Sequence, residues 1–160
     1  MVYLNKEKYL EMMIEKYSEM VYRLALTRTK SKENSEDVFQ DVFFRLSRKM
    51  PNFESEEHEK AWLIKVTINC SKNLLSSAFL RHTTEMKEEF IFETKERHDI
   101  YYAVQELTLK YRTIIHLYYY EGYKINEISK ILKINENTIK SRLTRAREKL
   151  KEKIEGGIEQ

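Results

Sequence analysis

The sequence predicts an all-α protein of two small helical domains, an N-terminal helical bundle and a C-terminal helix-turn-helix domain, joined by an acidic linker. Only three glycines and one proline occur in 160 residues, which leaves little material for the tight turns of sandwiches and barrels. The three glycines are too few to form a glycine-rich phosphate-binding loop anywhere in the sequence. Most kinase, NTPase and dinucleotide-binding functions are therefore excluded. The second observation is apolar residues recurring at three- and four-residue steps along most of the chain.

Three helices are expected in the N-terminal domain, residues 1–78. The first carries an apolar stripe from Leu10 to Ala25. The second is expected to begin with Ser35 as its N-cap, because Glu36 and Asp37 follow where carboxylates favour the helix dipole. Pro51 is expected to end it and to push the residue before it towards extended geometry.

The third predicted helix, from about residue 59 to residue 76, has a polar face of lysines and amides. Between residues 60 and 84 there are four basic residues and no Asp or Glu. Such a face suits the anionic backbone of a nucleic acid. An ordinary solvated helix face is the alternative that the charge pattern leaves open.

Residues 79–98 show no clean apolar period and are predicted to be a linker. They hold most of an acidic block, residues 85–106, in which seven acids face three bases. The scarcity of apolar residues at regular spacing gives this segment no helix face to bury.

The C-terminal domain, residues 99–154, is predicted to contain a helix-turn-helix, with a tail over residues 155–160. Gly122 ends one helix, a short helix follows over residues 125–132, and Lys133 and Ile134 form a turn. Asn135 is expected to cap a last, basic helix. Between residues 124 and 153 ten bases stand against four acids. The second helix of such a motif enters the DNA major groove, although an amphipathic helix on a bundle surface would share this pattern.

The runs over residues 35–46 and 61–75 closely resemble region 2 of bacterial sigma factors of the extracytoplasmic-function (ECF) group. The runs over residues 125–132 and 137–150 resemble region 4 of the same proteins. The resemblance implies a non-catalytic specificity subunit that binds core RNA polymerase and directs it to promoter DNA. An anti-sigma factor is a further candidate partner, and a cytoplasmic location without membrane insertion is expected.

The resemblance implies a different binding role for each of three helices. The helix of residues 35–46 would bind core polymerase through Asp37, Gln40, Asp41 and Phe44. The third helix would engage the minus-ten element through Lys65, Asn69, Lys72 and Asn73. The last helix would read the minus-thirty-five element through Asn137, Lys140, Ser141, Arg142, Thr144 and Arg145. Of these, Lys140, Ser141 and Thr144 would lie nearest the bases, and Arg142 and Arg145, together with Arg147, partly on phosphates. Pairing of some of these arginines with Glu148 or Glu152 is the alternative.

Two features bear on the limits of this resemblance. Lys133 stands where the turn of the family usually has glycine, which predicts either an altered angle between the two helices or a positive φ angle. Trp62 lies in the minus-ten motif, but a tryptophan beside an apolar stripe is more often a core residue.

Other functions remain as alternatives. A DNA-binding regulator with a helical sensory half would share the C-terminal motif, and a helical adaptor or anti-sigma-like protein would share the amphipathic helices. An enzyme is the weakest alternative, because no paired carboxylates or nucleophile–base arrangement appears. The single cysteine and four scattered histidines predict no disulfide, no metal and no cofactor.

Overall fold

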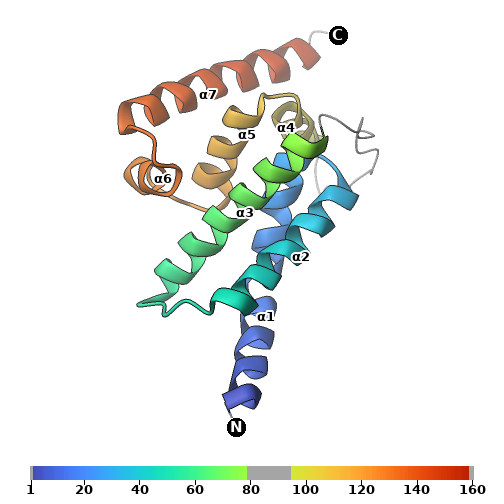
Figure 1. Cartoon of the computed structure of the whole chain (residues 1–160). Helices are drawn as coiled ribbons and strands as arrows, with labels where there is room; N and C mark the ends of the chain where they lie inside the picture. Colours follow the sequence, from blue (N-terminus) through green and yellow to red (C-terminus); the bar gives the residue numbers. More distant parts are fainter. Residues whose placement is uncertain (1, 79–94, 159–160) are drawn as a thin grey trace. The chain divides into compact units, whose positions relative to one another are not determined.

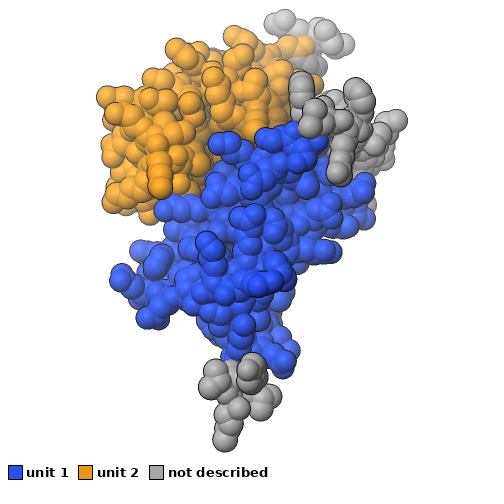
Figure 2. Space-filling model, in the orientation of Figure 1, with its two compact units in different colours: residues 1–86 blue, residues 87–160 orange. Residues whose placement is uncertain are grey.

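The computed structural model describes residues 2–78 and 95–158, and the regular elements within those ranges are all helices (Figure 1). The predicted all-α fold class is therefore confirmed. The chain divides into two compact units, residues 1–86 and residues 87–160, which Figure 2 shows in different colours.

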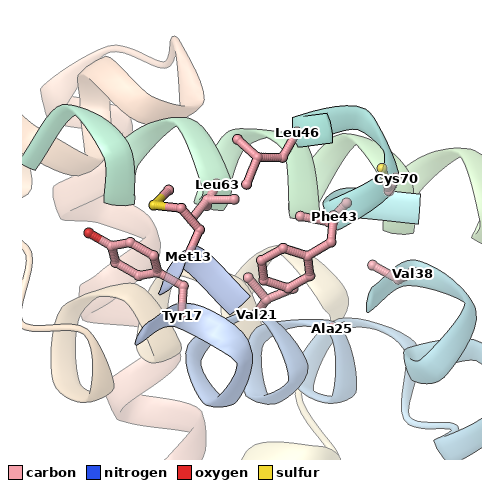
Figure 3. Close-up of a cluster of buried hydrophobic side chains, with 10 residues drawn as sticks. Met13, Tyr17, Val21, Ala25, Val38, Phe43, Leu46, Leu63 and Cys70 are labelled. Atoms are coloured by element: carbon pink, nitrogen blue, oxygen red, sulfur yellow. The ribbon is translucent and has the colours of Figure 1, made fainter. Parts of the chain in front are cut away.

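The first unit is a bundle of three helices, α1 (Val2–Thr29), α2 (Lys32–Lys49) and α3 (Glu56–Ala78). Each helix contributes residues of its predicted apolar stripe to one shared core (Figure 3). Ile14 of the first stripe is the exception, since 39% of its surface is exposed. Van der Waals packing and removal of apolar surface from water stabilise this arrangement. The core consists of Met13, Tyr17, Val21, Ala25, Val38, Val42, Phe43, Leu46, Leu63 and Cys70.

The start of α2 differs from the prediction by one turn. Ser31, with φ −142° and ψ 128°, is the N-cap, and its hydroxyl accepts a hydrogen bond from the Asn34 N–H. Ser35 lies inside the helix, fully buried, and donates to the Ser31 carbonyl at 2.6 Å. The prediction of Ser35 as the cap is wrong because both serines precede acidic residues. The local pattern could not separate them.

At the other end of α2, Pro51 has the predicted effect, since the helix ends at Lys49. The preceding residue, Met50, is not extended as expected. It takes a left-handed conformation with φ 42°, and its N–H bonds to the Leu46 carbonyl. Proline disfavours the right-handed α conformation in the residue before it, and the left-handed conformation of Met50 avoids that region as well.

The second unit consists of α4 (Lys95–Gln105), α5 (Leu109–Ile115), the π-helical turn η1 (His116–Tyr120), α6 (Ile125–Leu132) and α7 (Glu136–Ile158). Its core contains buried aliphatic side chains from α5, η1, α6 and α7, including Ile114, Leu117, Ile128, Ile139 and Leu143.

Two boundaries in the second unit differ from those expected. Helix α4 includes the last four residues of the range predicted as linker, and α7 continues to Ile158, into the predicted tail. Lysine, glutamate and arginine at the start of α4 are good helix formers that carry no apolar period, so periodicity missed them. The remainder of the predicted linker, residues 79–94, lies outside the described residues.

The turn between α6 and α7 shows how the chain accommodates Lys133 in place of glycine. Lys133 has φ 56° and ψ 45°, and its N–H bonds to the Ser129 carbonyl. The positive φ angle expected at this position is thus confirmed. For a residue with a Cβ atom this conformation costs about 1–2 kcal/mol. The Ser129 hydroxyl, which donates to the Ile134 carbonyl at 2.5 Å, helps to hold the turn.

Candidate nucleic-acid and polymerase interfaces

The residues predicted to bind core polymerase share the outer face of α2. Asp37, Gln40 and Phe44 are exposed, at helical steps of three and four that keep them together. Phe44 leaves 57% of its surface accessible, and the Arg48 guanidinium lies 5.1 Å from its ring centroid. An exposed aromatic ring among polar groups is typical of a protein-binding surface.

Asp41 lies at the inner edge of the same face and is half-buried. Arg45 donates from Nε to its carboxylate at 3.3 Å. On the other side Asp41 is close enough to Cys70 to affect the thiol. Burial, and secondly the Asp41 carboxylate, raise the pKa of Cys70 to about 12, so the thiol stays protonated at neutral pH. Cys70 is thus a core residue and no candidate nucleophile.

A shallow hollow of about 460 Å³ lies beside this face, between α1 and α2. Glu19 and Tyr22 of α1 line it together with Glu36, Phe39 and Gln40 of α2. The contribution of α1 was missed in the sequence, because only the pairing of the two helices brings these side chains to Gln40.

The four predicted minus-ten residues, Lys65, Asn69, Lys72 and Asn73, are all exposed on one face of α3. The opposite face, which includes Leu63 and Cys70, is buried in the core. Two lysines and two amides therefore face away from the core, as the periodicity predicts. Trp62 is half-buried, and its ring lies 5.7 Å from that of Phe53, which fits the packing role expected for it.

Polar contacts with α1 hold α3 near both ends. Near its N-terminus, Tyr17 donates to Glu59 at 2.9 Å, and Lys16 forms an ion pair with Glu56. Near its C-terminus, Arg28 donates from Nε to the Ser71 hydroxyl at 2.5 Å, and both residues are buried. Sequence reasoning missed these positioning residues. The one signal in the sequence that could have indicated them is that each is a charged or hydroxyl side chain next to the apolar stripe of its helix.

In the second unit, α7 begins as predicted with Asn135, whose side-chain oxygen accepts from the Asn137 N–H at 2.8 Å. The predicted minus-thirty-five residues follow on the exposed side of this helix, with Ile139, Leu143 and Ala146 buried on the other. Arg142 is half-buried, and the remaining predicted residues are exposed, namely Asn137, Lys140, Ser141, Thr144 and Arg145.

Arg147, which is expected partly on phosphates, makes contacts with two tyrosines of the same unit. Its Nε donates to the Tyr119 hydroxyl at 2.6 Å. Its guanidinium carbon also lies 5.3 Å from the ring centroid of Tyr118 and 5.5 Å from that of Tyr119. These three contacts join α7 to η1.

The described residues also bear on metal binding and membrane insertion. Among them, no three His, Cys, Asp or Glu side chains come together in a way that could hold a metal ion. No described helix is long and apolar enough to span a bilayer. The buried His116 lies 3.2 Å from a Glu121 carboxylate oxygen and stacks on Tyr120, so it packs inside the second unit.

Comparison with known proteins places both units. Residues 13–78 match the family model described as "Sigma-70 region 2", and residues 97–150 match that described as "Sigma-70, region 4". The RNA polymerase sigma factor SigV of Bacillus subtilis is 31% identical over 130 residues, which cover 78% of each chain. The ECF RNA polymerase sigma factor SigM of the same organism is 29% identical, covering 89% of this chain and 93% of that protein.

The fold has solved counterparts. The sigma factor RpoE from Bartonella quintana, crystallised in complex with the anti-sigma factor NepR, superposes with a TM-score of 0.80 at 21% identity. The alignment covers 92% of this chain and 98% of that one. From the two regions, their order, and the similarity to SigV and to the ECF factor SigM, the chain belongs to the ECF group of the sigma-70 family, non-catalytic subunits that direct promoter-specific initiation of transcription.

Proposed function

We propose that three separate faces divide the work of this sigma factor. The outer face of α2 binds core RNA polymerase, the polar face of α3 engages the minus-ten element, and α7 reads the minus-thirty-five element. One observation carries the proposal: α3 in the first unit and α7 in the second each present basic and amide side chains, at helical spacing, on the face turned away from the core.

The α3 face is suited to a melted strand. Asn69 and Asn73 are one turn apart and exposed, and an amide offers both a donor and an acceptor to the edge of an unpaired base. Lys65 and Lys72 add positive charge for the phosphates without an acidic residue between them.

The α7 face is suited to duplex DNA. Lys140, Ser141 and Thr144 lie in the N-terminal half of the helix, the part that enters the major groove in helix-turn-helix proteins. Lysine reaches purine edges there, serine and threonine reach bases or phosphates, and Arg142 and Arg145 reach phosphates.

On α2, Phe44 supplies an apolar anchor that Asp37, Gln40 and Asp41 surround with polar groups. This is the composition expected of a protein interface with a buried centre and a polar rim. The polymerase works in the cytoplasm, where this chain is proposed to act. An anti-sigma factor is a further proposed partner, since the solved relatives RpoE and CnrH are held in complexes with NepR and CnrY.

Run-off transcription with purified core polymerase tests this function. The protein is added or omitted on a library of genomic fragments from its source, and the expected result is protein-dependent initiation at a shared two-part promoter. Co-elution with core but no transcripts would point to a missing activator or promoter. Neither transcripts nor co-elution would favour a stand-alone regulator and contradict the proposal.

Variants assign the three faces. We expect Phe44→Ala to reduce co-elution with core, Asn69→Ala to reduce promoter melting, and Arg145→Ala to reduce duplex binding. Matched controls are Met12→Ala, whose side chain is 50% exposed on α1, Asn5→Ala on α1, and Lys151→Ala, exposed near the far end of α7.

A further inference from the structure

Arg147 lies in the basic run of α7, yet its guanidinium is engaged within the protein. It contacts two aromatic side chains 28 and 29 positions earlier in the sequence, by a 2.6 Å hydrogen bond to Tyr119 and by cation–π contacts to Tyr118 and Tyr119. A planar guanidinium can stack on one ring and donate in its own plane to another group at the same time.

The Arg147–Tyr clasp, meaning Arg147 with Tyr118 and Tyr119, connects two parts of the helix-turn-helix domain. Tyr118 and Tyr119 lie on η1, which precedes the helix-turn-helix motif. Arg147 lies on α7, the second helix of the motif, just after the side chains proposed to read DNA. Tyr118 also lines an open hollow whose other lining residues include Lys140. Tyr118 thus belongs to the clasp and also lines the same hollow as Lys140, the first basic residue of the proposed DNA-reading set.

We propose that Arg147 is a positioning residue for promoter recognition: the clasp fixes α7 against η1 and so sets how Lys140, Ser141 and Thr144 meet the DNA. This inference rests on the proposed function of α7. It assigns Arg147 a different role from Arg142 and Arg145, which lie in the same basic run and are proposed to contact phosphates directly.

The two roles differ in salt dependence. A residue that contacts a phosphate releases a counterion, and its loss lowers the slope of log affinity against log salt by about 0.9 for duplex DNA. A residue that acts through the protein leaves the number of phosphate contacts, and therefore the slope, unchanged. Its loss weakens binding to the correct sequence more than binding to a scrambled one.

The experiment uses the full chain loaded on core polymerase and two duplexes, the promoter found by run-off transcription and a version with a scrambled minus-thirty-five element. Affinity is measured between about 50 and 200 mM salt for Arg147→Gln, Tyr119→Phe and the double variant. We expect each single variant to lose about fivefold in promoter affinity, the effect of removing one hydrogen bond or an exposed cation–π contact. The salt slope and the affinity for scrambled DNA should be unchanged.

Because both variants break one contact, the double variant should lose less than the product of the single losses. Arg147→Lys should recover part of the affinity, since lysine retains a cation above the rings but not the planar donor. Arg145→Ala is the comparison variant, which should lower the salt slope. Lys151→Ala is the control, which should change neither the salt slope nor the promoter affinity.

Three results would overturn the inference. A slope reduced by about one for Arg147→Gln would make Arg147 a phosphate contact. Full affinity in Tyr119→Phe, or equal losses on promoter and scrambled DNA, would show that the clasp does not position α7. Failure of the unmodified protein to distinguish the two duplexes would instead refute the proposed function of α7.

Discussion

Helices α3 and α7 are of equal length, 23 residues each, and both present a polar face opposite a core, but they differ in chemistry and in support. The α3 face has lysines and amides, and buried or half-buried contacts from α1 hold both its ends. The α7 face is rich in arginine, and exposed contacts hold it, including Arg147 to Tyr119 and Lys153 to Glu106. The polar contacts that hold α3 are therefore shielded from water, whereas those that hold α7 are open to it, and the two helices differ in how far solvent and salt can weaken their support.

The largest expected effect tests whether the two helices depend on equivalent cores. Leu63 of α3 and Leu143 of α7 are both almost fully buried. Truncating either to alanine should lower the free energy of unfolding by about 2–5 kcal/mol, through lost burial and the cavity left behind. Urea denaturation measures this loss. A cost below 1 kcal/mol at one site only would show that the two cores are not equally packed.

A second effect sharpens the chemical difference between the faces. Asn69→Ala should make promoter melting less favourable by about 1–3 kcal/mol, because the base edge loses its hydrogen-bond partner, and should leave the salt slope unchanged. Permanganate reactivity of unpaired thymines measures the melting. Arg145→Ala should reduce duplex affinity and lower that slope by about 0.9. If Asn69→Ala instead lowered the slope, α3 would be acting as a phosphate-binding face like α7.

Binding to core polymerase should depend on α2 and on neither DNA-reading helix. We expect Phe44→Ala to weaken core binding by about 1–2 kcal/mol, because an exposed aromatic anchor is lost. Fluorescence anisotropy of the labelled protein against core measures it. Met12→Ala and Asn69→Ala should bind core normally, and weakening by either would contradict this division.

A last prediction concerns a buried contact and no binding surface, at Cys70, where α3 packs against α2. Its pKa, raised to about 12, favours the folded state below the ordinary thiol pKa of about 9. That contribution is lost as pH rises from about 9 towards 12. At pH 8 a thiol reagent should therefore react at least about 100-fold more slowly with the native protein than with the unfolded chain. Mass spectrometry follows the labelling.

Asp41 provides the control for that measurement, because its carboxylate is the second cause of the raised pKa. Asp41→Asn should make labelling of the native protein faster at pH 8. If the labelling rate were unchanged, burial alone would account for the shielding of Cys70, and the Asp41 carboxylate would have no influence on the thiol.

Much of the fold could be predicted because apolar spacing is a local property of the chain. The stripe from Leu10 to Ala25, the stop at Pro51 and the capping of α7 by Asn135 all follow from neighbouring residues. Boundaries were less certain where two signals competed. Ser31 and Ser35 are both suitable N-cap residues. In the structure Ser31 caps α2, whereas Ser35 is buried and its hydroxyl is hydrogen-bonded to that of Thr29.

The sequence by itself determined which side chains are exposed on each helix, because the 3.6-residue period assigns every position to the core or away from it. It also supplied the family, through motifs in their correct order. Only the tertiary structure decided which helices meet. The Arg28–Ser71 bond, the effect of Asp41 on Cys70 and the Arg147–Tyr clasp each join residues 28 to 43 positions apart, and periodicity along one helix carries no information about a partner on another.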